Sequence, residues 1–124
     1  MKHLKQASLL AIAMFAFCHA AWAAKPIEVG EDGETRIVLS GTVVGPVQSG
    51  SKVDGTFFKA FHLKLAQALR FDDGGSCGEQ ELRSLPLNQG DMARYQGKRI
   101  QVRAKVFCQE NRTGSYHLSD IEVL

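Results

Sequence analysis

The chain has 124 residues, 44% of them apolar, and its 15 lysines and arginines against 13 acidic residues give a formal net charge of +2. Its apolar runs are all shorter than the roughly 20 residues of a membrane-spanning helix, which argues against a transmembrane protein. This length and composition suit a single small globular core.

The first 23 residues have the three-part pattern of a cleaved secretory signal. Lys2 and Lys5 form a basic start, residues 9–17 form a short apolar run, and Ala21 and Ala23 supply the small side chains that precede a cleavage site. We therefore expect export to the periplasm or beyond, with cleavage near Ala23.

Loss of residues 1–23 would change the charge and the cysteine count of the remaining chain. Without its two lysines, 13 basic and 13 acidic residues remain, so the mature chain is formally neutral. Neutrality removes the electrostatic argument for a nucleic-acid or membrane-surface partner. Cys18 would leave as well. Its alternative role, as the acylated cysteine of a lipoprotein, is disfavoured because Phe17 stands where a small residue is needed.

Cys77 and Cys108 are the two cysteines of this predicted mature chain. An even number of cysteines in an exported chain favours a disulfide over two buried free thiols. On the chain-entropy estimate, closing a loop of about thirty residues contributes roughly 3 to 4 kcal/mol. We therefore expect a Cys77–Cys108 bridge to staple a small domain.

The first part of the mature chain contains one clear strand and one ambiguous element. Residues 24–35 are acidic and poor in large apolar side chains, so they are expected to form a flexible lead-in outside the core. Residues 36–44 alternate apolar and polar side chains and predict a strand that ends at a Gly-Pro pair. Residues 57–69 fit a strand by alternation and a helix by apolar residues at four-residue spacing. The local pattern leaves both alternatives open.

The second part is mostly strand. Residues 81–87 predict a weak strand, and Asp91 is placed to cap a short helical turn over residues 92–96. Residues 99–108 alternate most cleanly, with apolar side chains on one face and basic ones on the other. This alternation turns the cysteine at the end of that strand into the core.

The last strand is expected over residues 115–124. Its inward positions change phase along the strand, from Tyr116 to Ile121. Such a change indicates a β-bulge near Ser119 and Asp120.

This order of elements fits an all-β, five-stranded barrel of the oligonucleotide/oligosaccharide-binding (OB) type, with one short helix between strands 3 and 4, in a single domain over residues 36–124. That fold favours a strand at residues 57–69. The chain also resembles the family called domain of unknown function 4431, which occurs in small exported bacterial proteins. The matching residues are 39–43, 95–102, 106–107, 113, 117–118 and 121. The resemblance implies the same fold and an exported location, but no activity, and the family's histidine-rich turn is represented here by His117 alone.

Metal binding and catalysis have little support in the residue pattern. The mature chain contains only His62 and His117 as histidines. A zinc site needs three or four converging ligands, so these two with a carboxylate would be an incomplete set, and two surface or edge histidines are the simpler interpretation. There is no Cys-x-x-Cys or Gly-x-Ser-x-Gly motif, and we predict no catalytic residue, metal or cofactor.

A basic row is the one chemical asymmetry. Arg99, Arg103 and Lys105 share the outward face of the strand at 99–108. Such a row suits an anion or an acidic protein surface, and it equally protects a strand from pairing with another chain. Phe107 and Tyr116 are the only aromatic residues placed near it for base stacking, which further disfavours nucleic acid.

These observations favour a small exported binding domain without enzymatic activity, which engages a protein or an envelope component in the manner of an inhibitor or immunity protein. A metal- or small-anion-binding protein that uses the histidines or the basic row is one alternative. An enzyme of unrecognised type is another.

Overall fold

The computed structural model describes residues 25–124, so the predicted signal and its cleavage site lie outside the described residues. The domain is all-β, as predicted, and in this part of the chain no helix has the length and apolar character needed to cross a membrane. Its elements are β1 (Ile27–Glu28), β2 (Thr35–Ser49), β3 (Phe58–Asp72), β4 (Gln80–Asn88), the 3-10 turn η2 (Met92–Tyr95), β5 (Arg99–Gln109) and β6 (Ser115–Val123).

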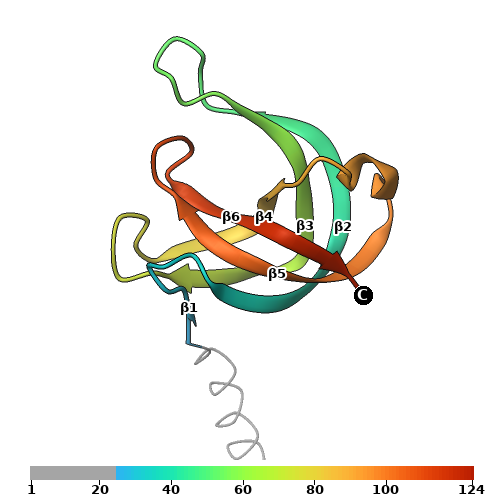
Figure 1. The fold of residues 1–124 in the computed structure, drawn as a ribbon, viewed down its shortest axis with the longest axis horizontal. Coiled ribbons are helices and arrows are strands. Elements are labelled where there is room, and N and C mark those ends of the chain that lie inside the picture. The colour runs from blue at the N-terminus through green and yellow to red at the C-terminus, as the bar shows by residue number, and fades with distance from the viewer. Residues whose placement is uncertain (1–24) are drawn as a thin grey trace, which may run out of the picture.

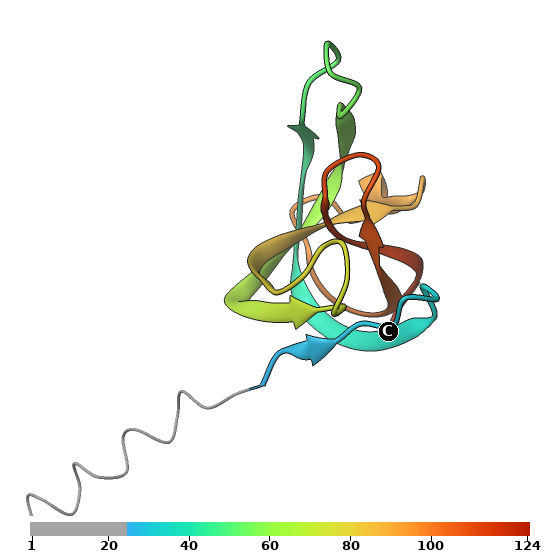
Figure 2. The same ribbon diagram turned by 90° about the vertical axis from the view of Figure 1, so that its left-hand side faces the viewer.

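The strands form one sheet that curls into a ring (Figure 1). Their order is β1-β3-β2-β5-β6-β4, and an additional pairing between β3 and β4 joins the two sides of the sheet. The pairs β1–β3 and β4–β6 are parallel, and the other pairs are antiparallel. The β2–β3 hairpin projects beyond the ring, beside the loop between β5 and β6 (Figures 1 and 2).

The core fills the inside of this ring. Alternate side chains of each strand point inward, because successive residues of a strand face opposite sides of the sheet. Side chains from four different strands are fully buried there, among them Leu63, Leu85, Val102 and Leu118. Burial of apolar side chains of this size contributes about 1.5–3 kcal/mol each to folding, so the packed core stabilises the ring-shaped sheet.

The ambiguous segment at residues 57–69 is a strand and, apart from Phe57, lies within β3. The strand is selected over the helix because β3 pairs with β2 on one side and with β4 on the other. The preceding strand is longer than predicted, because β2 does not end at Gly45 and Pro46. Its ladder with β3 is only interrupted between Val44 and Val47 and then resumes.

Two further predictions were wrong in part. The lead-in contains β1. Val29 is buried in the core and Ile27 packs against it, so these two apolar side chains anchor the acidic segment. The helix between β4 and β5 is only the 3-10 turn η2, and the Asp91 side chain makes no capping hydrogen bond. The predicted bulge in the last strand is confirmed: the β5–β6 register shifts opposite Asp120, whose φ is +50°.

Candidate functional site

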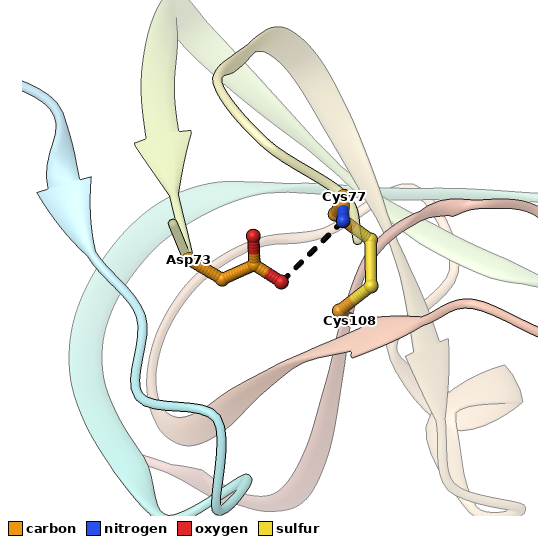
Figure 3. Close-up of side chains that lie close together, drawn as sticks. All are labelled: Asp73, Cys77 and Cys108. Carbon is orange, nitrogen blue, oxygen red and sulfur yellow. Dashed lines mark hydrogen bonds between the residues drawn. A yellow bond between two sulfur atoms is a disulfide. The ribbon is translucent and has the colours of Figure 1, made fainter. Parts of the chain in front are cut away.

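The predicted disulfide joins β5 to the loop that follows β3 (Figure 3). The Cα atoms of Cys77 and Cys108 are 5.9 Å apart, within the range that a disulfide spans. Beside it, the Asp73 carboxylate accepts hydrogen bonds from the backbone N–H groups of Gly75 (2.8 Å) and Gly78 (2.9 Å). Burial works against ionisation of Asp73, but these hydrogen bonds outweigh it and lower the pKa of the carboxyl group. The disulfide and these hydrogen bonds therefore fix the conformation of the loop between β3 and β4.

Tyr116 ties β6 to the same loop. Its hydroxyl group accepts a hydrogen bond from the Asp73 backbone N–H (2.8 Å) and donates one to the Gly78 carbonyl. Burial raises the pKa of Tyr116 to about 12. The side chain is fully buried, as its predicted inward position on the last strand implied, so it is not available to stack on a base at the surface.

The Tyr116→Phe variant is expected to lose about 1–3 kcal/mol of unfolding free energy, because two backbone groups in a part-buried loop lose their partner. Equilibrium denaturation with guanidinium measures this loss. Tyr95→Phe is the matched control, since the Tyr95 hydroxyl makes no hydrogen bond within residues 25–124, and it should change stability little. Equal stability of the two variants would contradict the structural role of Tyr116.

The two histidines, predicted to be surface or edge residues, are both buried. His117 lies on β6, where its Nδ1 atom is 2.8 Å from Asn88 Oδ1 and its Nε2 atom is 2.6 Å from Thr113 Oγ1. An amide oxygen only accepts, so this arrangement assigns the proton of neutral His117 to Nδ1. The Thr113 hydroxyl then donates to Nε2, and both ring nitrogens have partners.

His62 lies on β3 and is only half satisfied. Its Nδ1 atom is 3.2 Å from the Ser84 hydroxyl, whereas its Nε2 atom is buried without a hydrogen-bond partner in residues 25–124. A buried nitrogen in this state costs free energy, which marks His62 as an unusual core residue. We call His62, Ser84, Asn88, Thr113 and His117 the histidine cluster.

Aromatic rings close the histidine cluster. The Phe58 ring meets the His117 ring edge-on, with centroids 4.8 Å apart, and the Phe107 centroid lies 5.9 Å from the same ring. Burial lowers the pKa of His117 to about 4, with a further contribution from the nearby His62. Burial also lowers the pKa of His62. Both histidines are thus neutral at pH 7.

The histidine cluster lacks the form of a metal site. Among residues 25–124, one set of three metal-ligating side chains has its ligand atoms within 4.8 Å of one another, and it consists of Asp73, Cys77 and Cys108. Its two sulfur atoms are bonded to each other, so they are not available as thiolate ligands. His62 and His117 belong to no such set in this part of the chain.

The basic row is largely neutralised by acidic neighbours. Arg103 pairs with Glu122 on β6 at 3.1 Å, and the Lys105 Nζ atom lies 2.9 Å from Glu34. The row therefore does not present three free cations to an anion, as one hypothesis required. Arg99 is the exception, since it has no ion-pair partner within residues 25–124.

Three members of the histidine cluster were missed from the sequence, namely Ser84, Asn88 and Thr113. They are polar residues without a motif. The β3–β4 and β4–β6 pairings bring Ser84 and Asn88 to the histidines, whereas Thr113 lies in the β5–β6 loop, four residues before His117. The nearest signal was the inclusion of His62 and His117 among the candidates.

A comparison of the chain with protein-family models, curated proteins and solved structures finds no match.

Proposed function

We propose that this chain is a small exported binding domain without enzymatic activity, located in the periplasm or secreted, which engages a protein or another envelope component. The Cys77–Cys108 bridge supports an oxidising compartment. The signal pattern of residues 1–23 and the resemblance to domain of unknown function 4431 support export.

We further propose that the fold is an OB-type barrel. The cyclic order β2-β3-β4-β6-β5 and the 3-10 turn between β4 and β5 support this assignment. OB-type barrels bind ligands on the face of their second and third strands and with the loops that follow the first and fourth strands. In this chain these are β3, β4 and the loops at residues 50–57 and 110–114.

The observation that carries the proposal is the meeting of these two loops. The Arg112 guanidinium group donates a hydrogen bond of 2.8 Å to the Phe57 carbonyl, which ties the loop after β5 to the hairpin loop after β2. At the hairpin tip, the Lys52 ammonium group lies 4.9 Å from the centroid of the Phe57 ring. Next to it Val53 is 97% exposed. Val53 on this braced hairpin therefore offers a partner an exposed apolar contact, with the Lys52 ammonium group beside it.

The test replaces an exposed apolar side chain by aspartate at two places, one at the hairpin tip and one outside it. Val53→Asp at the hairpin tip is expected to weaken partner capture from an envelope extract at least tenfold, because the charge would have to be desolvated in the interface. Leu124→Asp is the control, since Leu124 is also an exposed apolar side chain and lies at the C-terminus, outside the hairpin tip. Quantitative mass spectrometry of captured proteins and glycans is the measurement.

Failure of the wild-type domain to capture any component would contradict the binding function. Equal capture by the two variants would contradict the placement of the surface at the hairpin tip.

A further inference from the structure

The β2 and β3 strands separate part-way along their length. They pair from Ser49–Phe58 down to Gly41–Leu65, and no further. Below that point residues 35–40 of β2 pair only with β5, and residues 66–68 of β3 have no ladder partner. In Figure 2 the two strands run together in the upper hairpin and diverge beneath it.

The point of separation is sharply defined by Gly41. A Cβ atom at this position would lie 2.5 Å from the Lys64 carbonyl oxygen, so the two backbones approach there as closely as glycine allows. Past Gly41, one edge of residues 35–40 is unpaired. Alternate residues of an antiparallel strand turn their N–H and C=O groups to its second edge, so this edge offers a row of free backbone groups.

The space between the diverging strands is a groove. It consists of two adjoining hollows that share Leu65 and Ala66. The open part is lined by apolar side chains, among them Val38, Leu39 and Leu69. Val38 is 49% exposed, as large an apolar surface as an edge strand usually avoids.

The closed end of the groove is basic. Thr42 lies directly between Lys64 and Arg99 in the strand register, and all three line this end. Both cations are exposed, and no acidic residue lines either hollow. The short Thr42 side chain leaves room for two long cationic side chains to reach one group from either side.

We infer that this groove binds the C-terminal segment of a partner polypeptide, which adds to the free edge of β2 as a strand and places its terminal carboxylate between Lys64 and Arg99. The rejoining of β2 and β3 at Gly41 stops an added strand, so one end of the peptide must lie there. Two cations at that end suit a carboxylate, and a strand that ends there with its C-terminus runs parallel to β2 and antiparallel to β3. Free backbone groups supply affinity, and the apolar lining selects alternate side chains.

This groove is distinct from the hairpin-tip surface, so the inference stands independently of the proposed function. The probe is a pair of hexapeptide pools with alternating Val, Ile or Leu and Ser or Lys, identical except that one pool has a free C-terminal carboxylate and the other a C-terminal amide. Six residues are enough, because an extended peptide of that length spans about 20 Å. Binding is followed through backbone amide NMR signals and through hydrogen exchange of residues 36–40.

The carboxylate pool is expected to bind at least tenfold more tightly than the amide pool and to protect amides of residues 36–40. Lys64→Gln combined with Arg99→Gln should reduce this preference to less than twofold. Lys59→Gln combined with Arg94→Gln, which removes the same charges from exposed sites outside the groove, should leave it intact. Val38→Asp should weaken both pools, whereas Val53→Asp should affect neither.

Three results would overturn the inference: no shift of the signals from residues 36–40 with either pool, equal binding of the two pools, or an unchanged preference in the Lys64 and Arg99 double variant. None of them bears on the hairpin tip, so the two proposals fail separately.

Discussion

Replacement of Cys77 and Cys108 by alanine is expected to lower the unfolding free energy by about 3 to 4 kcal/mol. The two cysteines are 31 residues apart, so the bridge restricts a long loop of the unfolded chain. The unfolding free energy of a domain of about 100 residues is only about 5–15 kcal/mol, so the double variant should fold but lose a large share of its stability. Guanidinium denaturation at pH 7 of the wild type and the double variant measures the difference.

Chemical reduction provides the control for the disulfide variant. The wild type under reducing conditions should approach the midpoint of the double variant, and the double variant itself should be indifferent to the reductant. If the unfolding free energy of the double variant lies within 1 kcal/mol of that of the oxidised wild type, the bridge adds little constraint. The hydrogen bonds of Asp73 and Tyr116 would then be enough to fix the loop.

The parts of the fold that follow from local chemistry were predictable. Residues 99–108 alternate so regularly that only a half-buried strand accommodates them, and β5 matches the prediction within a residue at each end. The disulfide followed from the cysteine count and from the inward position of Cys108. In both cases nearby residues carry the information.

Features that depend on distant segments were not predictable. Residues 57–69 satisfy a two-residue and a four-residue period equally well, and only the pairing of β3 with β2 and β4 selects the strand. The neutralisation of the basic row has the same origin, because Glu34 and Glu122 come from opposite ends of the domain. Likewise, no local pattern indicated that Val29 is a core residue.

The histidine cluster shows the limit most clearly. A lone His62 or His117 in a sequence is most simply taken for a surface residue. His117 is covered by the Phe58 and Phe107 rings and bound to Asn88 on β4, and His62 lies against Ser84 on the same strand, contacts that only the ring-shaped sheet assembles. Burial in the domain therefore lowers the pKa of both histidines, which no feature of the sequence indicated.

Acidification from pH 7 to pH 5 is expected to lower the unfolding free energy by about 2 kcal/mol through His117 alone. In the unfolded chain its pKa is about 6.5, whereas burial holds the pKa in the folded domain at about 4. Between these values the unfolded state binds a proton that the folded state excludes, so each step down in pH favours unfolding. The contribution vanishes above about pH 7, where both states are neutral.

His117→Gln tests this origin through the slope of stability against pH. Glutamine keeps a donor and an acceptor for Asn88 and Thr113 but does not titrate, so the loss between pH 7 and pH 5 should shrink by about 2 kcal/mol whatever the variant's absolute stability. The remaining slope belongs to His62, whose pKa burial also lowers, and it should disappear in the double variant with His62→Gln. Acidic residues titrate mainly below this window. If His117→Gln keeps the wild-type slope, His117 takes up its proton in the folded domain, which would place the ring in contact with water and open the Phe58 cover over the histidine cluster.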